Sequence, residues 1–133
     1  MFGIEDGFDM VIGNPPYVQL QKFARTQIQK DLQDVGYYTF QKTGDLYALF
    51  YERGLELTKK HTGVLSYITS NKWMRAGYGV SLRSYFSDKN PLVLIDCGPG
   101  IFESATVDTN IIMVQNAPNT DALHALTLAK DDR

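Results

Sequence analysis

The chain has 133 residues, 44% of them hydrophobic and 12% aromatic, which is enough apolar material for one globular domain. A formal net charge of -2, from 13 basic and 15 acidic residues, argues against a self-sufficient nucleic-acid-binding domain, which usually carries a strong positive excess. Cys97 has no disulfide partner, it shares no zinc-ligand spacing with His61 or His124, and without a signal peptide or membrane-spanning run we expect a cytoplasmic, metal-free protein.

The first expected element is a buried strand from Phe8 to Gly13, which stops abruptly at a loop containing two prolines. Residues 19–33 are rich in Gln, Lys and Arg and predict a solvated helix or a mobile loop. The clearest helix runs from Asp45 to Lys60. Asp45 is expected to cap it, Gly63 follows its basic end, and its expected apolar stripe consists of Leu46, Leu49, Phe50 and Leu57.

The second half of the chain repeats the order of strand, turn and helix. Val64–Thr69 predicts a strand, Ser70–Trp73 a polar turn and Val80–Phe86 a short amphipathic helix. Further strands are expected at Leu92–Cys97 and Asn110–Gln115, and the tail at Thr120–Lys130 is expected to be a helix or a linker. This alternation predicts an α/β sheet that is covered on both faces, at least for the first two units.

The loop Asn14-Pro15-Pro16-Tyr17 carries the strongest chemical signal. Ligands of open α/β sheets bind beyond the carboxyl ends of strands, where this loop is expected. A specified run of four residues arises by chance in a chain of this length roughly once in a few thousand sequences. The loop is therefore our candidate for the catalytic site.

A planar exocyclic amine is a poor nucleophile because its lone pair is delocalised into the ring. The Asn14 side-chain oxygen and the Pro15 carbonyl could accept both amino hydrogens and favour a pyramidal nitrogen. The two prolines restrict the backbone that presents these acceptors, and Tyr17 offers a ring on which a purine can stack. A base inside a duplex would have to be flipped out to reach them.

These residues resemble the N6-adenine DNA methyltransferases of restriction-modification systems that carry this motif. The resemblance runs from Phe8 to about Gln115, through Phe8–Tyr17, Gly44–Tyr47, Gly63–Trp73, Gly100–Glu103 and Val107–Val114. It implies a partial Rossmann-like methyltransferase sheet whose last two strands are antiparallel. It also implies transfer of a methyl group from S-adenosylmethionine to adenine in DNA. Asn14, Pro15, Pro16 and Tyr17 would be catalytic, and Phe102 would be a second stacking face.

The resemblance also implies that most of the cofactor site lies upstream, with only Asn14 and Pro15 contributing here. We therefore expect residues 1–117 to be the carboxyl-side half of a catalytic domain that is inactive alone. Residues 118–133 would be a tail or linker toward a target-recognition domain. An alternative order places the cofactor turn at Ile95–Gly100, which requires a helix directly after Gly100. Because residues 101–115 look like a loop and a strand, we favour the first account.

The expected partners are DNA, the upstream half of the same polypeptide and a target-recognition domain. No membrane is expected, and exposed sheet surface would favour self-association of the chain. Lys22, Arg25 and Lys72 are expected at the same sheet edge as the loop, either binding DNA phosphates or forming ordinary surface charge. For Trp73 a place in the core is favoured over stacking on a base.

Two other functions remain open from the sequence. Methylation of a glutamine amide in a protein is possible because that enzyme family shares the same four residues. The Gln- and Lys-rich segment after Tyr17 favours DNA over protein as the substrate. The third hypothesis is a non-catalytic module for DNA binding or assembly.

Overall fold

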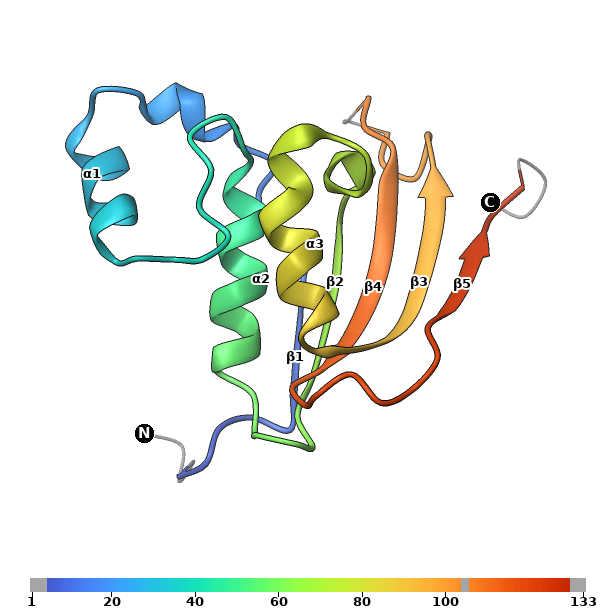
Figure 1. The fold of residues 1–133 in the computed structure, drawn as a ribbon. Coiled ribbons are helices and arrows are strands. Elements are labelled where there is room, and N and C mark those ends of the chain that lie inside the picture. Colours follow the sequence, from blue (N-terminus) through green and yellow to red (C-terminus); the bar gives the residue numbers. More distant parts are fainter. Residues whose placement is uncertain (1–4, 104–105, 130–133) are drawn as a thin grey trace.

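Five strands form one mixed sheet in the order β1-β2-β4-β3-β5 (Figure 1). The computed structural model describes residues 5–103 and 106–129. The strands are β1 (Met10–Gly13), β2 (Val64–Ser70), β3 (Asn90–Gly98), β4 (Thr109–Gln115) and β5 (His124–Thr127). β1 pairs with β2 and β5 with β3 in parallel, whereas β4 is antiparallel to both of its neighbours. The expected α/β sheet, with β3 and β4 antiparallel, is therefore confirmed.

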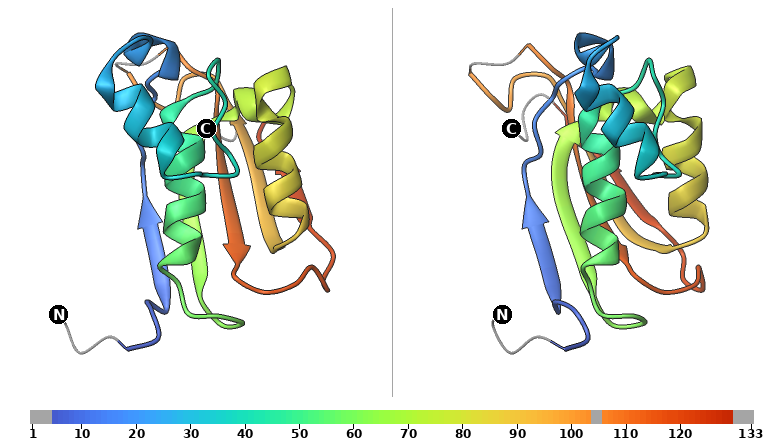
Figure 2. Two further views of the ribbon diagram at one scale, coloured as in Figure 1. Left: turned by 60° about the vertical axis from the view of Figure 1, so that its left-hand side comes forward. Right: turned by 90° about the vertical axis from the view of Figure 1, so that its left-hand side faces the viewer.

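The helices α2 (Leu46–Glu56) and α3 (Val80–Ser87) lie on one face of this sheet (Figure 2). The expectation that both faces are covered is wrong for the described residues. The connections from β1 to β2 and from β2 to β3 step across the sheet in the same direction. Since crossover connections between parallel strands share one hand, both helices are carried to the same face.

Burial along the strands follows this one-sided arrangement. On β2 the residues facing the helices are buried, and the alternate residues Val64, Ser66 and Ile68 are only half-buried. β1 lies at the sheet edge, and its uncovered face exposes Met10 by 54% and Ile12 by 72%. The strand expected to be buried from Phe8 to Gly13 is thus mostly exposed, because neither its free edge nor its outer face is covered.

Tyrosines form most of the contact between α2 and the sheet. Tyr47, Tyr51 and Leu55 recur at a helical spacing of four residues and are fully buried. Phe50 and Leu57 of the expected stripe are instead exposed by 42% and 38%. The expected stripe did not include the tyrosines, whose rings make up much of the buried face of this helix. The core also contains Ala48, Leu65, Tyr67, Trp73, Leu82, Phe86, Ile112 and Val114.

The ends of α2 also differ from the prediction. Asp45 occupies the N-cap position, but its side chain makes no capping hydrogen bond and accepts one from Tyr78 instead (2.7 Å). The helix ends at Glu56, before the expected Lys60, where the chain turns toward β2. There the Leu57 carbonyl accepts a hydrogen bond from the backbone of Phe8 (2.8 Å), so the turn is tied to the segment before β1.

The segment after Tyr17 and the tail complete the fold. The segment after Tyr17 forms η1 (Leu20–Phe23) and α1 (Gln27–Asp34). The helix α1 is solvated, has no buried residue and is capped by Thr26. The turn after β2 is formed by η2 (Asn71–Met74) and η3 (Gly77–Gly79). In the tail the expected helix or linker is replaced by β5, which extends the sheet beside β3. Among the described residues no helix has the length and apolarity needed to cross a membrane.

Candidate functional site

The Asn14–Tyr17 loop begins where β1 ends. Asn14 is exposed, Pro15 is buried and Tyr17 is half-buried. The Tyr17 hydroxyl donates a hydrogen bond to Asn14 Oδ1 at 2.8 Å. The exposed Asn14 thus has its side-chain oxygen next to the Tyr17 hydroxyl at the end of β1.

Backbone hydrogen bonds fasten the continuation of this loop to the start of α2. Leu20 donates to the carbonyl of Gly44 and Leu46 donates to the carbonyl of Val18, both at 2.8 Å. These bonds flank an antiparallel bridge between Gln19 and Asp45. The Tyr17 ring meets the buried Tyr47 ring edge to face, with centroids 6.3 Å apart. The loop is thus held from both its backbone and its aromatic side chain.

A cavity of about 170 Å³ lies next to Tyr17. Its lining comes from four separate segments that meet at one edge of the sheet: Tyr17, Gln19, Lys22, Asp45, Tyr47, Ser70, Lys72 and Val107. Lys22 and Lys72 therefore share one cavity, as expected from the convergence of strand ends. The exposed Arg25 and the half-buried Phe102 do not line this cavity. The loop that contains Phe102 contributes Val107 to the lining instead.

Asp45, Tyr47 and Tyr78 form a polar cluster at this cavity. Tyr78 commits its hydroxyl hydrogen to Asp45 Oδ2, and Asp45 is only 6% exposed. Burial, a hydrogen-bond interaction with Tyr78 and the negative charge of Asp45 raise the pKa of Tyr47 far above its ordinary value. Tyr78 and Asp45 lie close enough to raise this pKa, but within the described residues neither forms a bond with full hydrogen-bond geometry to the buried Tyr47 hydroxyl. Tyr47 was not among the site residues expected from the sequence, although Gly44–Tyr47 is one of the stretches that resemble the N6-adenine DNA methyltransferases.

A second polar network supports the site from beneath. Thr69 Oγ1 lies 2.8 Å from the hydroxyl of Tyr51 and 3.3 Å from Asn110 Oδ1. The same oxygen of Asn110 accepts a hydrogen bond from Trp73 Nε1 at 3.0 Å. Trp73 is 5% exposed, which confirms its place in the core. These bonds fix the relative positions of α2, β2, η2 and β4 under the cavity.

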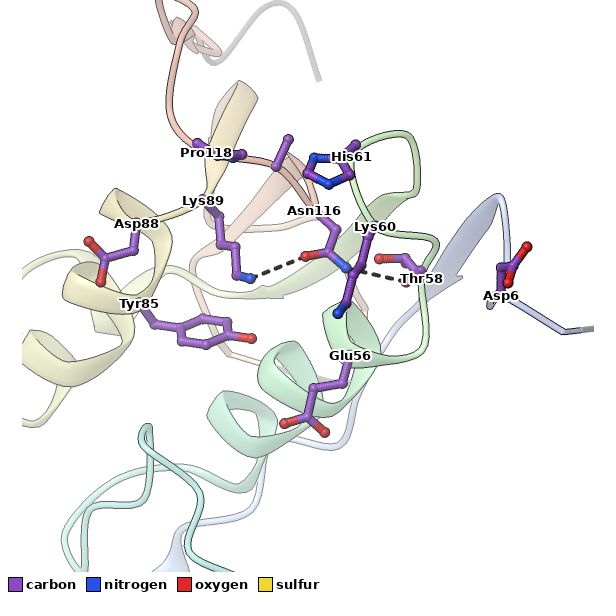
Figure 3. A pocket seen from close by; sticks show the side chains of 11 residues that line it. Asp6, Glu56, Thr58, Lys60, His61, Tyr85, Asp88, Lys89, Asn116 and Pro118 are labelled. Carbon is purple, nitrogen blue, oxygen red and sulfur yellow. Dashed lines mark hydrogen bonds between the residues drawn. The ribbon is translucent and has the colours of Figure 1, made fainter.

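A larger cavity of about 450 Å³ lies at the opposite end of the strands, where β2 and β3 begin and β4 ends (Figure 3). Asn116 stands at its centre, accepting a hydrogen bond from Lys89 (3.1 Å) and donating to the carbonyls of Leu55 and Thr58. These bonds join the end of α2 to the end of β4 and give the cluster a structural role. No group of three or more potential metal ligands occurs in the described parts of the chain.

The fold is similar to that of solved S-adenosylmethionine-dependent methyltransferases and of enzymes from restriction-modification systems. A class I S-adenosylmethionine-dependent methyltransferase, so named, from Listeria monocytogenes matches with a TM-score of 0.71 and 15% identity, over 94% of this chain and 38% of that one. The Type IIL restriction-modification enzyme MmeI, solved in complex with DNA, matches with a TM-score of 0.62 and 18% identity, over 87% of this chain and 16% of that one.

The sequence comparison narrows the class to a family. The model of the Eco57I restriction-modification methylase family matches residues 1–102, and the chain belongs to this family. The Type II restriction enzyme and methyltransferase RM.Eco57I of Escherichia coli is 31% identical over 117 residues, which are 86% of this chain. The matched region spans 12% of that relative's length.

Proposed function

We propose that this chain provides the catalytic loop for methyl transfer from S-adenosylmethionine to the N6 amino group of adenine in DNA. The observation that carries the proposal is the exposed Asn14 beside Tyr17, at the carboxyl end of β1 and next to a polar cavity. An amide oxygen, a backbone carbonyl and an aromatic ring are the three groups that capture of a planar aromatic amine requires.

In this proposal the chain's own residues position the amine and need no general base. Asn14 Oδ1 and the Pro15 carbonyl accept hydrogen bonds from its two N–H groups, which localises the nitrogen lone pair, and one of these protons passes to water after the N–C bond has formed. Tyr17 stacks on the flipped base, and Phe102 stacks on its other face. The buried Pro15 and the two backbone bonds to the Gly44–Leu46 segment hold the acceptors in place. The loop therefore loses little conformational entropy when the base binds.

S-adenosylmethionine would supply the electrophilic methyl group. Among the described residues only Asn14 and Pro15 would lie next to this cofactor, because they are at the end of β1, where the methyl donor must meet the amine. Gly98-Pro99-Gly100 does not fit a cofactor turn, since no helix follows it in residues 101–103 or 106–108 and β3 leads instead to the antiparallel β4. We propose that the main cofactor site and the target-recognition domain belong to other parts of a longer polypeptide.

Substitution of Asn14 tests the proposal. Asn14→Ala in the complete open reading frame should lower labelled-methyl transfer to DNA by at least about 100-fold, the usual cost of losing one preorganised transition-state partner. DNA binding should change little, because Asn14 contributes no charge. Asn119→Ala, an exposed asparagine at the opposite end of the strands, is the matched control. Full turnover by Asn14→Ala, or transfer to a glutamine peptide in place of DNA, would refute the proposal.

A further inference from the structure

The cavity beside Tyr17 combines two unpaired cations with one anion. Lys22 lies in η1 and Lys72 in η2, and neither takes part in a salt bridge within the described residues. Asp45 is the acidic residue in the lining, so the two lysines and one aspartate give a formal charge of +1. Asp45 is also turned toward Tyr78, which occupies one of its oxygens.

Uncharged donors complete this environment. The Tyr47 side chain is 0% exposed and lines the cavity, and its hydroxyl, although near Tyr78 and Asp45, makes no hydrogen bond of full geometry within the described residues. Ser70, 2% exposed, also lines the cavity, and its hydroxyl oxygen accepts only a long bond from Lys72 N (3.3 Å). A buried hydroxyl without a partner costs free energy unless something else completes its bond.

We infer that this cavity is a subsite for one phosphodiester group of the DNA strand whose base is presented to Tyr17. The inference rests on the proposed function and deepens it by naming where the strand is held. A single net positive charge matches a monoanionic diester, and the hydroxyl groups of Tyr47 and Ser70 can donate to its oxygens. The volume of about 170 Å³ is room for a diester and a few waters, since one water occupies roughly 30 Å³.

Basic residues near the Asn14–Tyr17 loop either line the proposed subsite or lie outside it. Lys22 and Lys72 approach the cavity from segments 50 residues apart in sequence, which only the fold brings together. Arg25 lies on the exposed loop after η1, outside the lining, where its charge is free to act on the general field of the strand. Loss of Lys72 should therefore weaken one defined contact, whereas loss of Arg25 should not.

The first experiment uses the full chain and small anions. In ¹⁵N-labelled protein, dimethyl phosphate, a minimal phosphodiester, should shift the amide signals of Ser70 and Lys72 in a saturable way, and inorganic phosphate should compete. Tyr47→Phe should weaken dimethyl phosphate binding about tenfold, because it removes one hydrogen bond to an anion. Lys72→Gln should weaken it similarly. Lys60→Gln, a lysine of the opposite cavity, should bind like the original chain.

The stability of Tyr47→Phe separates a binding role from a structural one. Because the hydroxyl makes no hydrogen bond of full geometry within the described residues, its removal should leave the urea midpoint unchanged or raise it. A lowered midpoint together with unchanged dimethyl phosphate affinity would assign the hydroxyl to the fold and overturn the inference. Absence of any saturable shift at Ser70 and Lys72 would also overturn it.

A DNA titration separates this inference from the proposed function. Fluorescence anisotropy with single-stranded DNA should show that Lys72→Gln reduces the slope of log affinity against log salt by about 0.7, the contribution of one phosphate contact. If Lys72→Gln and Lys60→Gln behave alike on DNA, the subsite is wrong although DNA binding stands. If dimethyl phosphate binds but DNA does not, the diester chemistry stands, and the assignment to DNA falls together with the proposed function.

Discussion

The hydrogen bond from Tyr17 to Asn14 bears directly on how the loop could act. A carbonyl oxygen has two lone pairs, so the bond from the Tyr17 hydroxyl leaves one for an incoming amine. The bond also prevents the carboxamide from rotating its nitrogen into that position. Tyr17 therefore has two separable parts, a ring that can stack and a hydroxyl that orients its neighbour.

Tyr17→Phe removes the hydroxyl and keeps the ring. We expect methyl transfer by the complete open reading frame to fall about 2- to 10-fold, the range for one exposed hydrogen bond. Fluorescence of 2-aminopurine at the target position should remain as high as in the original protein. Tyr17→Ala should lose both the rate and the fluorescence signal. If the rate of Tyr17→Phe equals that of the original protein, the hydroxyl does not orient Asn14.

At this scale the sequence identified the residues of the loop better than their surroundings. The four residues Asn14–Tyr17 were recognisable because consecutive prolines after a strand are rare and chemically specific. The contribution of Tyr47 was not, because a tyrosine at a helical spacing of four from other apolar residues looks the same whether its hydroxyl is paired or free. Its importance arises from the bridge between Gln19 and Asp45, a long-range pairing with no local signature.

Among the elements, α2 packs closely against β2. Gly54 lies in the buried face of α2, and a Cβ atom there would collide with the side chains of Leu65 and Tyr67. The glycine is thus required by packing, although it weakens the helix by about 1 kcal/mol relative to alanine. The helix α2 and the alternation of strands and helices were predictable from periodicity. The buried face of α2 was not, because the expected stripe contained leucines and Phe50 and left out the tyrosines.

Gly54→Ala tests this close approach. The collision should outweigh the gain in helix propensity and lower the free energy of unfolding by about 1 to 3 kcal/mol, the usual cost of overpacking. Urea denaturation followed by circular dichroism measures the change. Gly77→Ala in η3 is the control, because no atom lies within 4 Å of the added Cβ. An unchanged midpoint for Gly54→Ala would contradict the close contact between α2 and β2.

β5 shows where element prediction failed. His124–Thr127 has four exposed residues and no run of apolar side chains. Its strand conformation comes from pairing with β3, from His124 opposite Val93 to Thr127 opposite Asp96. A short edge strand depends on a partner distant in sequence, so its local composition carries little information about it.

For the whole molecule, partly buried tyrosines make stability sensitive to alkali. Burial and the hydrogen bond to Asp45 raise the pKa of Tyr78 to about 12, and burial with Glu52 and Glu56 raises the pKa of Tyr85 to about 12. An unfolded tyrosine titrates near pH 10, so the unfolded state loses these protons first. The stabilisation should be complete below pH 10 and disappear as the pH rises toward 12.

Urea titrations at a series of pH values measure this effect. The free energy of unfolding should be constant from about pH 7 to 9 and should fall steadily between about pH 10 and 12. Tyr78→Phe should make the fall shallower, because it removes one of the groups that titrate differently in the two states. A profile that stays flat to pH 12 would show that these hydroxyls are solvated in the folded protein.

The sheet topology places the Asn14–Tyr17 loop and the turn at residues 118–120 at opposite ends of the molecule, which matters for inserting sequence into the chain. Because β4 runs against its neighbours, Val107 before it meets Lys72 after β2, whereas the exposed turn at residues 118–120 belongs to the far end (Figure 1). Added sequence at that turn would extend away from the loop after β1. A fluorescent reporter spliced there would follow the protein without entering the space where a substrate must sit.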